Sequence, residues 1–128
     1  MKAAVAKVLN HCIDEFPNLK IAYLTSDGLR HFSGLEPHAW QMGFTVKWLT
    51  ESQINGEPGT AFEGENRTIP WLAWGPYIWD NTWDVSYFTD RVHVSPKERE
   101  IFVERFWHLL STDSVARAWF LRYPEKRD

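Results

Sequence analysis

The 128-residue sequence has a single cysteine, Cys12, which excludes an intramolecular disulfide. It has no apolar run near the roughly 18 residues that a membrane-spanning helix needs. The short apolar opening is interrupted at Asn10 and His11, and no small-residue cleavage pattern follows it. We therefore expect a soluble protein without a membrane span or signal peptide, in a compartment that the sequence leaves unknown.

Basic residues are also scarce relative to acidic ones. The 14 lysines and arginines are scattered and are outnumbered by 17 aspartates and glutamates, for a formal net charge of -3. A nucleic-acid-binding surface needs a basic patch or stripe, and none is present. We expect no nucleic-acid partner.

Signals for metal or cofactor chemistry are few. The five histidines include no pair three or four residues apart on an expected helix. His11 and Cys12 are adjacent and so point to different sides, which does not suit zinc. No glycine-rich phosphate loop occurs. We expect neither a metal site nor a cofactor.

The sequence is rich in aromatic residues. Hydrophobic residues make up 44% and charged residues 24%, which are ordinary values for one globular domain over residues 1–128. The eight tryptophans, however, concentrate between Trp40 and Trp83. Packing in the core and loops is one interpretation. An aromatic-lined substrate cleft is the other, because rings stack on the flat apolar faces of sugars and acyl groups.

Periodicity and capping signals predict six elements in the order helix, strand, helix, strand, helix, helix. A breaker, Ser26-Asp27-Gly28, follows the first strand, and Gly43 predicts close packing inside the second helix. The last two helices have apolar faces that we expect to be buried, at Phe102, Phe106, Leu109 and Leu110 in the longer one. The expected elements are Val5–Phe16, Leu19–Thr25, Pro37–Ile54, Ile69–Gly75, a helix capped by Ser95 and a short helix capped by Thr112-Asp113.

Two strands joined by a helix of this length predict a parallel pair with a right-handed crossover. The second helix is apolar over so much of its surface that we expect cover on two sides. Parallel sheets normally contain more than two strands and are covered on both faces. The pattern therefore predicts half of a doubly wound α/β domain.

Asp90 precedes His93 by three residues, directly before the helix cap at Ser95, in the stretch "YFTDRVHVSPKERE". An imidazole accepts and returns a proton near neutral pH, and it works best when a carboxylate fixes one of its ring nitrogens. Asp and His are also common loop residues, so the spacing alone indicates a structural turn more often than a catalytic pair.

Longer segments carry a family resemblance. "FPNLKIAYLTS", "EPHAWQMGFTVKWLTESQINGEP", "PWLAWGPYIWD" and the terminal stretch with "TDSVARAWF" resemble the C-terminal half of SGNH (GDSL-like) hydrolases, over nearly the whole chain. The resemblance implies a partial three-layer α/β/α, flavodoxin-like unit whose N-terminal strands are missing. It implies His93 as the general base, Asp90 as its orienting carboxylate, and a substrate-binding aromatic wall that includes Trp74, Tyr77 and Trp79.

The chain departs from the family pattern at several points. Arg91 and Val94 stand where glycine and proline are usual, and either could re-aim the turn. No G-D-S segment supplies the nucleophilic serine, and no G-x-N-D segment supplies the oxyanion donors. "TSDGL" follows the wrong strand, so Ser26 is interpreted as a turn residue.

Two functions are consistent with these residues. The favoured function is one half of a carboxylic-ester hydrolase, acting on an ester substrate (acylated carbohydrates included) once an N-terminal half complements it. The alternative is a catalytically inactive remnant that binds a partner chain or a carbohydrate through its strand edge and tryptophans, with a homodimer completing a four-stranded sheet as the concrete form.

Overall fold

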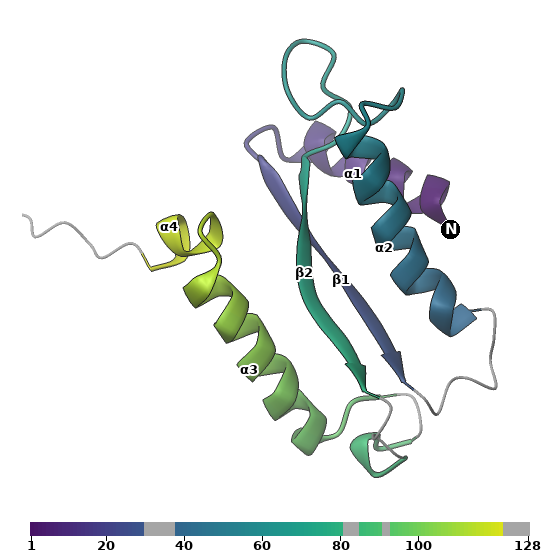
Figure 1. The fold of residues 1–128 in the computed structure, drawn as a ribbon, viewed down its shortest axis with the longest axis vertical. Coiled ribbons are helices and arrows are strands. Elements are labelled where there is room, and N and C mark those ends of the chain that lie inside the picture. The colour runs from purple at the N-terminus through teal and green to yellow at the C-terminus, as the bar shows by residue number, and fades with distance from the viewer. Residues whose placement is uncertain (30–37, 81–84, 91–92, 122–128) are drawn as a thin grey trace, which may run out of the picture. The chain divides into compact units, whose positions relative to one another are not determined.

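The computed structural model describes residues 1–29, 38–80, 85–90 and 93–121, and its described elements are shown in Figure 1. The chain divides into two compact units, residues 1–82 and 83–128, and each is described by itself. The described residues form a two-stranded parallel sheet and four α-helices, which confirms the α/β class. The single domain expected from the length stays a prediction.

The two strands of the first unit pair in parallel over most of their length. Strand β1 spans Ile21–Leu29 and strand β2 spans Trp71–Asp80. Both were predicted to end earlier, at Thr25 and at Gly75, and both predictions were wrong at these ends. The pairing continues to Leu29 and Asp80 because an irregularity in the ladder accommodates the residues that looked like breakers.

The irregularity is a β-bulge. Leu24 pairs with Trp74 and Ser26 pairs with Tyr77, so one residue of β1 lies opposite two residues of β2, Gly75 and Pro76. Proline lacks the N–H that a regular ladder uses, and a bulge is one of the positions in a sheet that tolerates it. The same feature places Ser26 inside β1, which corrects its interpretation as a turn residue.

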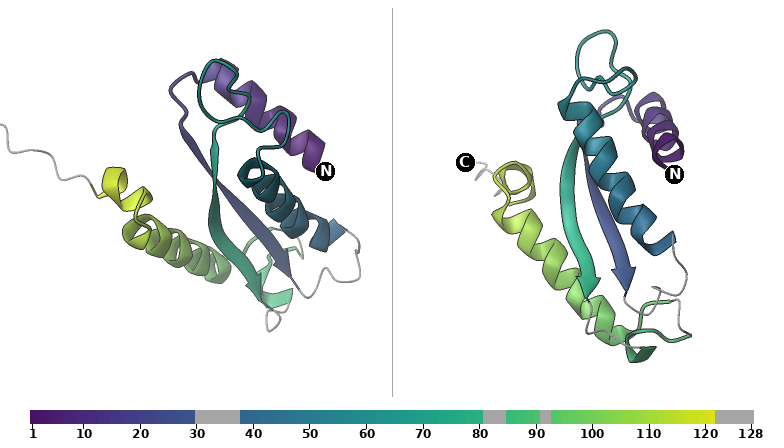
Figure 2. Two further views of the ribbon diagram at one scale, coloured as in Figure 1. Left: turned by 45° about the horizontal axis from the view of Figure 1, so that its top comes forward. Right: turned by 45° about the vertical axis from the view of Figure 1, so that its right-hand side comes forward.

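Helices α1 (Lys2–Glu15) and α2 (His38–Ile54) reproduce the predicted segments to within a few residues, although Pro37 lies outside the described residues. Both helices lie against the same face of the strand pair (Figures 1 and 2), where their side chains join one core cluster. The cluster consists of Leu9, Leu49, Ile69 and Leu72, with Val5, Ala6, Ala22 and Leu24 packed against it.

A buried glutamine connects the end of α2 to the start of β2. Gln53 is 7% exposed, and its Nε2 donates to the carbonyl oxygens of Thr60 (3.2 Å) and Pro70 (3.0 Å). Its Oε1 accepts from the backbone N–H of Leu72 at 2.7 Å. These three bonds hold the loop between α2 and β2 against the sheet.

The apolar stripes of α2 are covered unequally, which corrects the expectation of cover on two sides. Val46 and Leu49 are buried, at 8% and 1% exposure. Phe44 and Trp48 remain 45% and 48% exposed and stack on each other with ring centroids 5.2 Å apart. Helices α1 and α2 share one face of the sheet, so α1 and the sheet cover part of the apolar surface of α2. The stripe that contains Phe44 and Trp48 is left exposed.

The second unit contains a 3-10 helix, η2 (Val85–Tyr87), and helices α3 (Pro96–Thr112) and α4 (Ala116–Phe120). Ser95 caps α3 as predicted, accepting from the backbone N–H of Glu98, and Pro96 occupies the first turn. Oδ1 of Asp113 accepts from the backbone N–H groups of Val115 and Ala116 just before α4, whose N-cap residue is Val115 rather than the predicted Thr112-Asp113.

The apolar face predicted for α3 is only partly buried. Phe106 is 36% exposed, and Phe102, Leu109 and Leu110 are of intermediate burial rather than fully enclosed. Within this unit, the short elements α4 and η2 contact only part of the 17-residue helix, and the burial predicted for the whole face stays a prediction. Among the described helices, none has the length and apolar character that crossing a bilayer requires.

Candidate functional site

The loop that carries Asp90 and His93 is closed by backbone pairing. Phe88 and Val94 form an isolated antiparallel bridge, and the N–H of Ser95 donates to the carbonyl oxygen of Tyr87 at 2.9 Å. Inside this bridge, the N–H of Thr89 donates to the carbonyl oxygen of His93 at 2.8 Å. Residues 87–89 therefore lie beside residues 93–95, immediately before the capped start of α3.

Both carboxylate oxygens of Asp90 contact His93. Oδ1 accepts from the backbone N–H of His93 at 2.8 Å, and Oδ2 lies 2.6 Å from the ring Nδ1. The first bond is a turn-forming contact of the kind that aspartate commonly makes. The second fixes the ring: with Nδ1 held as the donor, the neutral imidazole presents Nε2 as its proton acceptor.

The pair is open to solvent. The side chain of His93 is 79% exposed and that of Asp90 is 56% exposed. Since Nδ1 is engaged by the carboxylate, the exposed part of the ring includes its Nε2 edge. The arrangement can accept a proton from a hydroxyl that approaches from outside the loop. Arg91 lies outside the described residues, whereas Val94 takes part in the bridge that closes the loop.

A second feature, which we call the aromatic cleft, lies within residues 1–82. It is a hollow of about 220 Å³ between α2 and the two strands. Trp74 and Tyr77, two of the three predicted wall residues, line it. They are 49% and 54% exposed. The cleft is lined by Ser26, Gly43, Phe44, Lys47, Trp74 and Tyr77.

The predicted site residues thus fall into two groups. The structure brings Asp90 together with His93 in the second unit, and Trp74 together with Tyr77 in the first. Trp79 belongs to β2, where its backbone pairs with Gly28, and its side chain lies outside the described part of the chain.

Sequence reasoning missed the contribution of α2 to the aromatic cleft. Phe44 and Lys47 lie three residues apart and so share one side of the helix. Gly43 brings that side close to β1: a Cβ at this position would lie 3.9 Å from the Cβ of Ser26. This is one ordinary van der Waals contact, so the structure does not show the close packing predicted at Gly43. The aromatic stripe containing Phe44 was the sequence signal for the contribution of α2.

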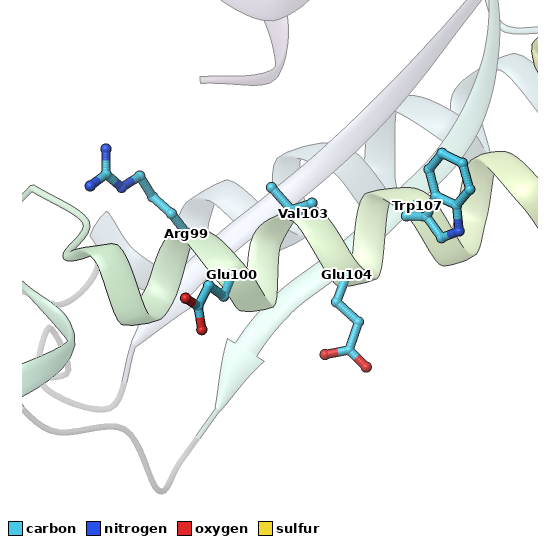
Figure 3. A pocket seen from close by; sticks show the side chains of 5 residues that line it. All are labelled: Arg99, Glu100, Val103, Glu104 and Trp107. Carbon is cyan, nitrogen blue, oxygen red and sulfur yellow. The ribbon is translucent and has the colours of Figure 1, made fainter.

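A shallow groove of about 470 Å³ follows the surface of α3 (Figure 3). Its lining comes entirely from this helix: Arg99, Val103 and Trp107 recur at four-residue intervals, and Glu100 and Glu104 form the adjoining row. Val103 and Trp107 are 68% and 59% exposed. The groove is an open helix face rather than an enclosed cavity.

Within the described ranges, no group of three or more His, Cys, Asp or Glu side chains is placed to hold a metal ion. Comparisons with protein-family models, with curated proteins and with solved structures find no match to this chain. The candidate site is therefore argued from its own geometry.

Proposed function

We propose that this chain supplies the acid–base half of a serine-type carboxylic-ester hydrolase of the SGNH kind, to which its sequence bears a resemblance. The observation that supports the proposal is the 2.6 Å contact between Asp90 Oδ2 and His93 Nδ1 in a loop tied at both ends. A general base needs an oriented ring with one accessible nitrogen, and this loop provides both.

The chemistry needs a hydroxyl from another polypeptide. A serine Oγ supplied by a complementing N-terminal half would attack the ester carbonyl carbon while its proton passes to Nε2 of His93. Asp90 would stabilise the resulting imidazolium, which then protonates the leaving alcohol as the acyl–serine ester forms. Water would hydrolyse that ester by the same proton transfers, with oxyanion donors also contributed by the other half.

Co-expression with the N-terminal half of a GDSL-type hydrolase tests the proposal, with p-nitrophenyl acetate as substrate. We expect turnover from the pair of halves and only background hydrolysis from this chain alone. His93→Ala and Asp90→Asn should each lower kcat by roughly 10³-fold or more, because removing a member of a working triad has effects of that order.

Two matched variants separate catalysis from loop structure. Thr89→Val removes the 3.1 Å bond from Thr89 Oγ1 to the carbonyl oxygen of His93 without touching the ring contact, so turnover should remain. His108→Ala removes an exposed imidazole on α3 and controls for nonspecific hydrolysis. If a complemented, folded His93→Ala enzyme keeps the wild-type kcat, the assigned role is wrong.

The second candidate is association without catalysis, with another copy of the chain as the partner. The observation that favours it is the row of Arg99, Val103 and Trp107 on α3, flanked by Glu100 and Glu104. In an antiparallel pair of α3 helices centred on Val103, Arg99 of each copy would lie opposite Trp107 of the other, so each guanidinium would cover an indole.

Sedimentation equilibrium over a range of concentrations tests this candidate. We expect a reversible dimer that Val103→Glu disrupts, because the two-fold axis would bring the new carboxylates together. Val8→Glu, at an equally open position on α1 (62% exposed), is the matched control and should leave the dimer intact. A monomer at every concentration would exclude the interface.

A further inference from the structure

The aromatic cleft contains a buried polar side chain, that of Ser26. Ser26 is only 5% exposed, yet it lines the cleft from the middle of β1. Its position depends on the bulge, which offsets the pairing from Leu24–Trp74 to Ser26–Tyr77. The bulge thereby places Ser26 alongside both exposed rings of β2.

The walls are aromatic and come from two elements. Phe44 projects from α2, whereas Trp74 and Tyr77 project from β2, and all three remain 45% to 54% exposed. Aromatic rings held in this way offer flat apolar surfaces on which another ring can stack. At about 220 Å³, the cleft is below the roughly 300–1,000 Å³ of sites for drug-sized ligands. It therefore fits a single ring or the end of a chain of rings.

The polar side chains of the cleft, Ser26 and Lys47, determine which class of ligand ring it can bind. Lys47 is bonded through Nζ to Glu51 Oε1, so its charge is balanced and an anionic ligand would gain little. A pure hydrocarbon would cover the hydroxyl of Ser26 without offering it a hydrogen bond, and a buried hydroxyl left unpaired is unfavourable. A ring with an apolar face and a hydroxylated rim can stack on the aromatic side chains and hydrogen-bond the polar groups of Ser26 and Lys47.

We propose that the aromatic cleft binds a neutral pyranose sugar, with the ring stacked between Phe44 and Trp74 and its hydroxyls directed at Ser26 and Lys47. The proposal does not rest on the hydrolase function, because the cleft lies within residues 1–82 and needs neither Asp90 nor His93. Failure of one proposal leaves the other standing.

Titration of the ¹⁵N-labelled full chain tests the proposal, with the tryptophan indole N–H signals as the readout. The probes are the methyl β-D-glycosides of glucose, galactose and xylose, each compared with benzoate as the anionic ring and toluene as the hydrocarbon ring. We expect at least one glycoside to shift the Trp74 indole signal saturably, and to do so at lower concentration than benzoate or toluene.

Three variants make the assignment specific. Trp74→Ala should raise the Kd about twofold to twelvefold, the range that corresponds to an aromatic contact of roughly 0.5–1.5 kcal/mol. Trp107→Ala removes an exposed indole outside the cleft and should leave the Kd unchanged. Gly43→Ala adds a methyl group to the cleft wall and should weaken binding although the variant folds at least as well as the wild type.

Several results would overturn the proposal. One is that none of the three glycosides binds, and another is that benzoate or toluene binds more tightly than all of them. A glycoside that binds with equal Kd to the wild type and to a folded Trp74→Ala variant would also place the sugar elsewhere.

Discussion

Two glycines, Gly75 in β2 and Gly43 in α2, should respond oppositely to the same substitution by alanine. At Gly75 an added Cβ would overlap Thr25 Oγ1 and would lie 2.9 Å from the carbonyl oxygen of Leu24 and 3.0 Å from its carbonyl carbon. The threonine hydroxyl can rotate away. The carbonyl of Leu24 is backbone of the paired strand, so relief requires the strands to separate at the bulge.

The surroundings of Gly43 are open enough for a methyl group. The nearest atom to an added Cβ, the Cβ of Ser26, would be 3.9 Å away, which is an ordinary van der Waals contact. Alanine inside a helix is more favourable than glycine by about 0.8–1.0 kcal/mol. Overpacking of the kind expected at Gly75 costs roughly 1–3 kcal/mol. The two variants should therefore differ in free energy of unfolding by about 2–4 kcal/mol.

Urea denaturation followed by far-ultraviolet circular dichroism measures this difference. We expect the midpoint of Gly43→Ala to lie above that of the wild type and the midpoint of Gly75→Ala to lie below it, with similar slopes. If Gly75→Ala unfolds at the wild-type midpoint, the close approach of the two strands at the bulge is wrong. If Gly43→Ala is destabilised, the packing of α2 on Ser26 is tighter than described.

Three further substitutions test other contacts. Gln53→Leu removes the partner of three backbone groups, each worth about 1–3 kcal/mol when buried and unsatisfied, so its urea midpoint should fall markedly. Hydrogen bonds from Ser52 and Lys2 lower the pKa of Glu57 from 4.5; its stabilising contribution is therefore present above that pH and lost as the pH falls below it. In acid titrations, Glu57→Gln should unfold with a shallower pH dependence below pH 4.5 than the wild type, and an unchanged profile would contradict the assignment. Asp113→Ala removes the side-chain acceptor of two backbone N–H groups just before α4 and should cost about 0.5–2 kcal/mol, measured by thermal unfolding, whereas Asp14→Ala on α1 should cost little.

The helices could be predicted closely because their signals are local. Ser95 and Pro96 act within the first turn of the helix that they begin, and the structure confirms their roles. Asp113 accepts from the backbone N–H groups of Val115 and Ala116, although the N-cap residue of α4 is Val115. The strand ends could not be predicted in this way. Gly75-Pro76 ends a strand in isolation, but here the pair lies in a bulge opposite Thr25, and only the partner strand reveals that the ladder continues.

The same distinction applies to the candidate sites. Asp90 and His93 are three residues apart, so one loop sets their geometry, and the sequence alone indicated the pair. The aromatic cleft is lined by Ser26 of β1, Phe44 of α2 and Trp74 of β2. These three elements come together only when β1 and β2 pair and α2 packs against them. Its aromatic wall could be foreseen in part, whereas the buried hydroxyl and the lysine could not.

The exposure of His93 also limits what a complementing half must supply. A base that is 79% exposed can receive a proton, but it does so in a medium that screens every charge nearby. Oxyanion stabilisation is strong only where water is excluded and donors are fixed in advance. A second polypeptide that merely added a serine would therefore give slow turnover. The partner that the proposed function requires must also bury Asp90 and His93, so the exposure of these two side chains should fall in any active complex.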